Sequence, residues 1–226
     1  MHRFIGWKTS REHHLLSDLE YNYHCFCDWA ENVIDIREQF PLKRELTLKI
    51  AEDLGINHPV DNKTNTPIVM TTDCFLTMRK GSSVVYKART LKFEKDLNDE
   101  RVIEKFVIEK CYWEQQGIDW SIVTEKELPT TFIGNLKFLR DAYFVNDAET
   151  VALLMEDWNS FTGSILENLQ AFDMKYNFEI GTGISLYKHA LAKKLLKVNM
   201  HEKINLNEDV SNVIVATLSD SKKRWA

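Results

Sequence analysis

The period of the apolar residues changes once along the chain, near residue 125, and this change constrains the fold more than any other feature. Before it, segments of helical period alternate with segments in which every second residue is apolar. After it, most segments have helical period. Alternating helices and strands are typical of a mixed α/β sheet domain. The sequence therefore predicts two domains, residues 1–125 with a sheet and residues 126–226 mainly helical.

A β-hairpin is expected at the centre of the first domain. Its strands cover 67–78 and 82–88, joined by a turn at Lys80 and Gly81. The other elements follow from the apolar period and from Gly55 and Gly117, which stand where helices end. In chain order they are a helix over 12–31, a strand over 33–36, a helix over 43–54, a helix over 98–116 capped by Asn98, and a strand over 118–124.

The second domain resembles a winged helix-turn-helix module in its order of elements. Helices are expected over 132–143, 149–173 and 184–195. The stretch LLKVNMHEKINL, 195–206, then alternates like two short strands joined at 201–203. Three helices followed by a hairpin allow one helix to enter a DNA groove and the hairpin to touch the backbone. Such modules also bind proteins, so both kinds of partner stay open.

Charge restricts any contact with nucleic acid to a local surface. The net charge of −5 argues against a chain coated with DNA-binding residues. No acidic residue occurs over 181–200, however, where Lys188, Lys193, Lys194 and Lys197 cluster. This basic segment is a candidate for binding DNA or a partner protein. A solvated helix face explains the same lysines equally well.

The sequence indicates a cytoplasmic protein. It has no run of eighteen apolar residues, and its first ten residues lack the apolar core of a secretory leader. The four cysteines show neither paired CxxC spacing nor the density of a disulfide scaffold, which suits a reducing compartment. We therefore expect no membrane span and no structural zinc.

Common catalytic motifs are absent. The chain has no Gly-rich phosphate loop, no HExxH and no GxSxG, which argues against nucleotide hydrolysis, zincin and α/β-hydrolase chemistry. A cluster formed by His13, His14, His24, Cys25 and Cys27 matches no familiar zinc-binding spacing. The chemistry must come from other residues.

Three charged residues of the first domain suit metal-dependent phosphodiester hydrolysis, which needs carboxylates to hold a cation and often a lysine to polarise water. Asp73 lies in mid-strand among apolar neighbours, and Lys87 lies on the partner strand of the hairpin. Glu20 on the first helix could complete the set. Simpler explanations remain, because Ser17 and Glu20 also fit a capping box and Lys87 also fits an edge-strand lysine.

Long segments of the chain closely resemble the TnsA family, the endonuclease subunits of heteromeric cut-and-paste transposases. The resemblance covers nearly all of the first half and, more loosely, the helical second half. The segments that carry it are HHLLSDLE (13–20), DIREQFPL (35–42), GINHPV (55–60), MTTDCFL (70–76), the lysine of VVYKA, DERVIEKFVIEKCYW (99–113) and WSIVTEKEL (120–128).

The resemblance implies a restriction-endonuclease-like first domain that uses magnesium, for which manganese can substitute. Glu20, Asp73 and Lys87 match the family's catalytic glutamate, aspartate and lysine. Glu109 falls where the family has a further functionally sensitive acid, although an exposed helix glutamate is the simpler interpretation. Asp73, Glu20 and the backbone carbonyl of Tyr86 would hold the metal.

One departure from the restriction-endonuclease pattern concerns the residues before the lysine. Such sites usually have Glu or Gln, any residue, then Lys, whereas this chain has Val85, Tyr86 and Lys87. A valine side chain cannot bind a metal. Weaker metal affinity is the hypothesis that follows.

The resemblance also implies a place in a reaction. The enzyme would cleave the 5′ ends of the transposon, while a DDE-type transposase cleaves and joins the 3′ ends and an ATPase regulator contacts the C-terminal domain. Two alternatives stay open. One is a stand-alone restriction or repair nuclease of the same fold, and the other is a non-catalytic assembly or regulatory protein.

Overall fold

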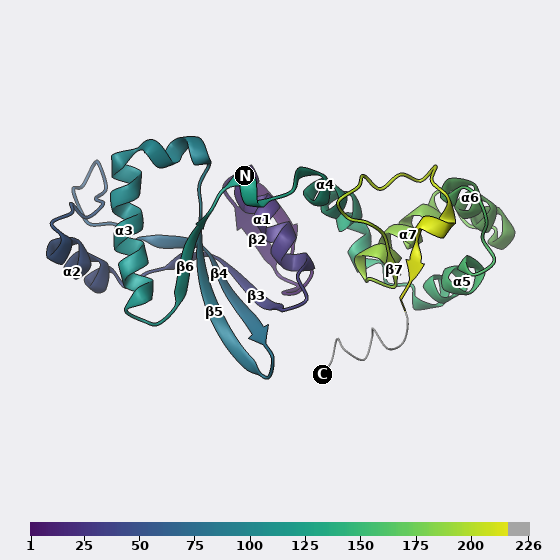
Figure 1. Cartoon of the computed structure of the whole chain (residues 1–226), viewed down its shortest axis with the longest axis horizontal. Helices are drawn as coiled ribbons and strands as arrows, with labels where there is room; N and C mark the ends of the chain where they lie inside the picture. The colour runs from purple at the N-terminus through teal and green to yellow at the C-terminus, as the bar shows by residue number, and fades with distance from the viewer. Residues whose placement is uncertain (217–226) are drawn as a thin grey trace. The chain divides into compact units, whose positions relative to one another are not determined.

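A computed structural model describes residues 1–216 (Figure 1). The chain divides into two compact units, the first covering Met1–Leu128 and the second beginning at Pro129. The first unit is a mixed α/β sheet and the second is mainly helical, as the apolar period predicts. Within residues 1–216, no helix combines the length and the apolar character needed to cross a membrane.

A four-stranded sheet forms the centre of the first unit, in the order β3-β4-β5-β6. Strands β3 (Val33–Pro41), β4 (Thr71–Lys80) and β5 (Ser83–Leu91) are antiparallel neighbours. The predicted hairpin is therefore confirmed, with Gly81 in the turn at a φ of 61°. Strand β6 (Asp119–Val123) runs parallel to β5 and completes the sheet.

Helices cover both faces of this sheet (Figure 1). On one face, α2 (Arg44–Leu54) and α3 (Glu100–Glu114) pack against Phe75 of β4 and Ala88 of β5. The α3 helix makes the connection from β5 to the parallel strand β6, as a parallel pair requires. Asp99, rather than the predicted Asn98, caps this helix by accepting the backbone N–H groups of its first turn.

The start of the chain differs from the prediction. Strands β1 (His2–Ile5) and β2 (Glu12–Leu15) form a separate two-stranded sheet that the sequence analysis did not predict. The helix expected from residue 12 begins later, as α1 (Asp18–Trp29). Its N-cap is Ser17, whose hydroxyl accepts the backbone N–H of Glu20. Residues 12–15 alternate between exposed and buried, which is the strand period that a helical prediction overlooked.

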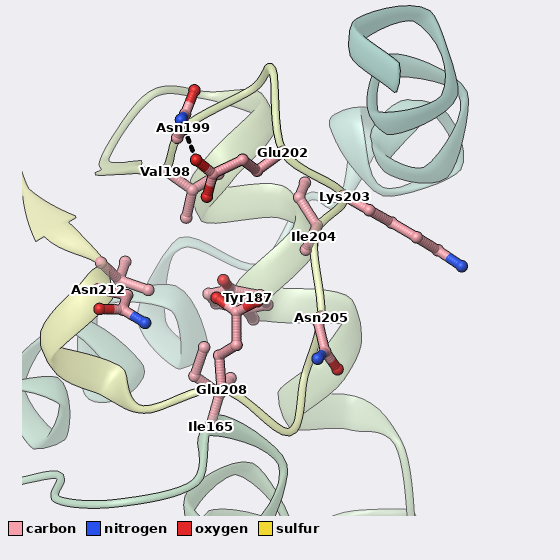
Figure 2. Close-up of a pocket in the computed structure, with 11 residues that line it drawn as sticks. Ile165, Tyr187, Val198, Asn199, Glu202, Lys203, Ile204, Asn205, Glu208 and Asn212 are labelled. Carbon is pink, nitrogen blue, oxygen red and sulfur yellow. Dashed lines mark hydrogen bonds between the residues drawn. The ribbon is translucent and has the colours of Figure 1, made fainter. Parts of the chain in front are cut away.

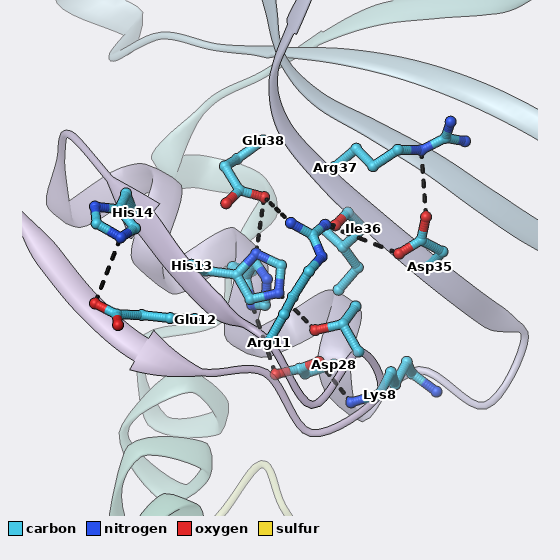
Figure 3. Close-up of polar contacts among 12 residues, drawn as sticks. Lys8, Arg11, Glu12, His13, His14, Asp28, Asp35, Ile36, Arg37 and Glu38 are labelled. Atoms are coloured by element: carbon cyan, nitrogen blue, oxygen red, sulfur yellow. Dashed lines mark hydrogen bonds and ion pairs between the residues drawn. The ribbon is translucent and has the colours of Figure 1, made fainter.

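Polar contacts fasten the β1-β2 sheet to β3 and α1 (Figure 3). The ring of His13 is fully buried, and its Nδ1 lies 2.8 Å from the Glu38 carboxylate. Burial alone would raise the pKa of Glu38, but the bond from His13 and the charge of Arg11 bring it down to about 2. On the other side, Asp28 of α1 accepts the backbone N–H of Trp7.

Up to residue 216, the second unit contains four α-helices, one more than the sequence predicts. The prediction of one helix over 149–173 is wrong, because the structure has two helices there. The first helix ends at Trp158, and the chain passes through Gly163 at a φ of 75° before the second helix begins. The elements of this unit are α4 (Thr130–Leu139), α5 (Ala148–Trp158), α6 (Ile165–Tyr176), α7 (Thr182–Ala192), β7 (Leu196–Lys197) and β8 (Ile214–Val215).

The predicted wing, a hairpin across residues 201–203, is also wrong. Strand β7 pairs instead with β8, near the end of the described chain. The buried side chain of Asn135 holds the intervening loop, since its amide donates to the carbonyls of Met200 and Glu202 and its oxygen accepts the N–H of Ile204. These backbone groups find their partners in a side chain rather than in a second strand.

Helices α6 and α7 approach closely at Gly183. Asp173 of α6 is buried and accepts the backbone N–H groups of Gly181 and Gly183 at the start of α7. A Cβ atom at Gly183 would lie 2.8 Å from the Leu169 carbonyl oxygen, which is backbone and cannot swing away. The contact therefore requires glycine.

We predict that Gly183→Ala destabilises the protein by about 1–3 kcal/mol, because the added methyl group forces the two helices apart. Gly134→Ala is the matched control, since its Cβ meets nothing within 4 Å in α4. It should stabilise by about 0.5–1 kcal/mol through helix propensity. Urea denaturation followed by circular dichroism measures both changes. Equal midpoints for the two variants would contradict the packing argument.

Candidate active site

A pocket of about 420 Å³ opens in the first unit. It lies where the start of α1, the strands β4 and β5, and the helix α3 meet. Its ionisable lining consists of four carboxyl groups and two lysines, of which Lys92 follows β5 directly. These residues are Glu20, Asp73, Lys92, Asp96, Lys105 and Glu109. Two of the three predicted catalytic residues and the possible additional acid thus meet in one place.

Asp73 is held between the two neighbouring strands. Its Oδ1 accepts the side-chain amide of Gln39 on β3 at 3.1 Å, and its Oδ2 accepts the backbone N–H of Leu91 on β5 at 2.7 Å. Gln39 has a φ of 46°, so the β3-β4 ladder is distorted beside Asp73. Burial raises the pKa of Asp73 to about 6, and the negative charge of Glu20 adds to this effect.

Glu20 caps a helix and lines the pocket at once. Its carboxylate accepts the Ser17 hydroxyl at 2.8 Å and the Leu16 backbone N–H at 3.1 Å. These contacts resemble the capping box that the sequence left open for this residue, except that the carboxylate binds the N–H of Leu16 rather than that of the N-cap residue Ser17. Glu20 is only 9% exposed, however, and its charge acts on Asp73. The cap therefore fixes a carboxylate at the pocket wall.

Glu109 is 3% exposed on α3, which excludes the exposed helix glutamate considered above. Its Oε1 accepts the hydroxyls of Thr72 at 2.5 Å and Thr90 at 2.6 Å. Burial raises the pKa of Glu109 to about 7 against these hydrogen bonds, and the charge of Asp73 contributes. The pocket therefore holds carboxyl groups that resist simultaneous ionisation.

The structure does not bring Lys87 to the pocket. Its Nζ lies 3.5 Å from the Asp119 carboxylate, and the residue is absent from the pocket lining. Lys87 stands opposite Leu76 in the ladder, three residues from Asp73, so strand alternation directs Lys87 and Asp73 to opposite faces. Strand pairing alone predicts that the two residues are neighbours, but it does not say to which face of the sheet each side chain points.

Two lysines that the sequence prediction did not include line the pocket, Lys92 and Lys105. Lys92 follows β5, and its positive charge acts to lower the pKa of Asp73. Tyr86, whose backbone carbonyl was the expected metal ligand, pairs with Thr77 in the hairpin and does not line the pocket. The sequence does carry a pattern that includes Lys92, since the tripeptide Thr90-Leu91-Lys92 ends in lysine as the restriction-endonuclease tripeptide does.

The carboxyl groups do not form a closed metal cage. Among residues 1–216, no group of three or more His, Cys, Asp or Glu side chains is arranged to hold a metal ion. Glu20 and Asp73 nevertheless interact through their charges. Magnesium is usually bound by one or two carboxylates and keeps several waters, so this pair fits such an ion.

Two of the four lysines in the predicted basic segment pack on aromatic rings. The ammonium of Lys188 lies 4.5 Å from the ring centre of Phe138, and that of Lys193 lies 3.3 Å from that of Tyr143. Burial lowers the pKa of Lys193. Lys194 follows α7 at a φ of 58°, and Lys197 belongs to β7. Binding of DNA or a partner by this segment stays a prediction.

The second unit has a pocket of its own, of about 290 Å³ (Figure 2). Tyr187 lies at its centre, fully buried, while Lys203 points away from it. Burial raises the pKa of the Tyr187 hydroxyl, and the charge of Glu208 adds to the effect. None of the four lysines of the basic segment lines this pocket.

Comparison with known proteins identifies the class first. A family model described as the N-terminal part of TnsA-like endonucleases matches residues 30–125, which include Asp73, Lys92 and Glu109. A second model, described as the C-terminal part of the TnsA endonuclease, matches residues 127–200. Both parts of the chain thus match endonuclease models.

A relative then specifies the family. The transposon Tn7 transposition protein TnsA of Escherichia coli is 34% identical to this chain over 215 residues. The match covers 92% of this chain and 77% of that protein. The chain therefore belongs to the TnsA family of endonucleases, as the resemblance of its segments indicates.

The raised pKa of Glu109 predicts a pH-dependent stability. Native Glu109 keeps its proton up to about pH 7, whereas the unfolded chain releases it near the ordinary value of 4.5. The native state then binds more protons between these values, so stability falls as the pH rises through them. Without divalent metal, Glu109→Gln should be more stable than the native protein at pH 8 by about 1–3 kcal/mol.

This gain should nearly vanish at pH 4.5, where native Glu109 carries its proton and about half of the unfolded chains do. Urea denaturation in the presence of a chelator at the two pH values measures it. Glu114→Gln on the same helix is the control, because that side chain is exposed and should show no comparable gain. A Glu109→Gln protein that is no more stable than the native protein at pH 8 would refute the argument.

Proposed function

We propose that this chain is the endonuclease subunit of a transposase and hydrolyses phosphodiesters at the 5′ ends of the transposon, on the strand that is not transferred. Its membership of the TnsA family and the name of its Escherichia coli relative support this proposal. The observation that carries it is the meeting of Glu20, Asp73, Lys92 and Glu109 in one pocket of the first unit.

Asp73 and Glu20 would hold a magnesium ion at the scissile phosphate, and manganese could replace it. When bound, the ion supplies positive charge to the phosphate and lowers the pKa of a coordinated water. Gln39 and the Leu91 N–H keep the Asp73 carboxylate in place without turning it from the pocket. Glu109 adds a third carboxyl group beside Asp73.

Lys92 takes the catalytic position that the sequence assigned to Lys87. Its ammonium group orients the attacking water and stabilises negative charge that develops on the phosphate. The tripeptide that corresponds to the restriction-endonuclease pattern is then Thr90-Leu91-Lys92, with threonine in place of Glu or Gln. Leu91 replaces Tyr86 as the residue whose backbone carbonyl would face the metal. Glu109 on α3 supplies the carboxylate that Thr90 lacks.

The first unit is proposed to have a restriction-endonuclease-like fold. Three antiparallel strands, a parallel fourth strand reached through α3, and a pocket beside Asp73 on the central hairpin suit that class. For the second unit we propose a module that binds the ATPase regulator or DNA, without the wing of a winged helix. The other proposed partners are transposon-end DNA and a DDE-type transposase. A DNA substrate places the protein in the bacterial cytoplasm.

Two rival functions are distinguished by simple observations. A stand-alone restriction or repair nuclease would cut DNA without any transposase. A non-catalytic assembly protein would not cut DNA even with its partners present. Carboxyl groups with raised pKa values in a pocket with a lysine favour an enzyme over an assembly protein.

The test is a reconstitution of the chain with its cognate transposase, regulator and magnesium on a donor plasmid, with the cuts mapped on each strand. We expect Lys92→Met to lower 5′-end cleavage by about 10²- to 10³-fold while 3′-end cuts persist. Lys87→Met is the matched control and should cut at the native rate, since Lys87 is paired with Asp119 outside the pocket.

The opposite result is equally informative. Loss of 5′ cleavage in Lys87→Met with full activity in Lys92→Met would show that Lys87 on the hairpin is the catalytic lysine and that Lys92 is not. Full activity in both variants, or native protein that cuts no 5′ end, would remove the support for a nuclease centre in this pocket.

A further inference from the structure

Two tryptophans and two threonines surround the Glu109 carboxyl group in a symmetric arrangement. The indole nitrogen of Trp113 lies 2.7 Å from the Thr72 hydroxyl, and that of Trp120 lies 3.0 Å from the Thr90 hydroxyl. Both hydroxyls in turn contact Oε1 of Glu109. Thr72, Thr90 and Trp113 are buried, so water does not compete for these bonds.

The direction of every hydrogen bond in this cluster follows from the chemistry of its members. An indole N–H can only donate. Each threonine oxygen therefore accepts from its tryptophan and gives its single proton to Glu109 Oε1. The separations of 2.5 and 2.6 Å are those of short O–H···O hydrogen bonds. Oε1 is thus committed to two threonine donors, Trp120 adds a hydrogen bond to the carboxyl group, and Oε2 is the oxygen that neither threonine contacts.

The cluster is built into the strands that also hold Asp73. Thr72 directly precedes Asp73 on β4, and Thr90 directly precedes Leu91, whose N–H binds Asp73. The two hydroxyls thus tie Glu109 to β4, which carries Asp73, and to β5, whose Leu91 N–H binds Asp73. Any rotation of the Glu109 carboxyl would break both short bonds at once.

We propose that Thr72, Thr90, Trp113 and Trp120 form a clamp that positions Glu109, so that Oε2 faces the pocket beside Asp73 and takes part in metal binding. The inference rests on the proposed nuclease function. Burying a carboxyl group on α3 costs free energy that burying an apolar side chain would not. Four side chains from four elements, β4, β5, α3 and β6, are committed to keeping its carboxyl group fixed, which a purely structural residue does not need.

The test compares Thr72→Val, which removes a hydroxyl at nearly constant volume, with Thr72→Ser, which keeps it. In the reconstituted complex, Thr72→Val should lower 5′-end cleavage by about 10- to 100-fold. Thr72→Ser should restore most of that loss. In a Glu109→Gln background, Thr72→Val should cause less than about a threefold further loss, because positioning a residue that has lost its function has no effect.

A second measurement does not depend on cleavage. Binding of Mn²⁺ to the chain alone, followed by electron paramagnetic resonance, should be about tenfold weaker for Thr72→Val than for native protein or Thr72→Ser. Trp120→Phe tests the other half of the clamp at a half-buried position and should weaken Mn²⁺ binding in the same direction. It replaces Thr72→Val if that variant does not fold.

Three results would overturn the clamp. One is native Mn²⁺ affinity in both Thr72→Val and Trp120→Phe. Another is an equal loss of cleavage from Thr72→Val with and without Glu109, which would indicate a structural effect. The third is native activity in Glu109→Gln. If the native complex cuts no 5′ end, the proposed function fails, and the Mn²⁺ measurement still decides the clamp.

Discussion

The hydrogen bond from the Leu91 backbone N–H to Asp73 joins the parts of the site, because it ties a carboxylate on β4 to the end of β5. Lys92 follows Leu91 directly, and Thr90, which holds Glu109, precedes it. The positions of three pocket groups relative to one another therefore depend on the register of one hairpin. A slip of β5 by one residue would turn Thr90 away from Glu109 and Lys92 away from Asp73. The packing of Phe75 and Ala88 under α2 and α3 fixes this register.

Burying like charges close together costs free energy, and the same charges would bind a cation. Burial raises the pKa values of Asp73 and Glu109, and charge adds to the effect, since Glu20 raises the pKa of Asp73 and Asp73 raises that of Glu109. A divalent cation bound beside these groups would relieve their repulsion. The cap of α1 serves the same end, since it fixes Glu20 at the pocket wall through Ser17 and Leu16.

The sequence predicts the parts of this protein that depend on local pattern. The hairpin, α2 ending at Gly55, and the acids Glu20 and Asp73 could all be found from period and chemistry. Lys92 was not predicted, although the tripeptide Thr90-Leu91-Lys92 ends in lysine, because the side chains that share a face with Asp73 depend on the register between strands. The wing failed because Asn135, more than sixty residues away, satisfies the loop's backbone groups. Burial of Glu109 likewise depends on long-range packing that no local pattern reveals.

We propose that Asp73 and Glu20 hold the catalytic metal in the pocket that Lys92 lines. The decisive experiment is to grow crystals of the protein with Mn²⁺ and to collect data for its anomalous scattering. We expect an anomalous peak at about 2.0–2.2 Å from carboxylate oxygens of Asp73 and Glu20. A peak beside Asp119 and away from this pocket, or no peak at saturating Mn²⁺, would contradict it.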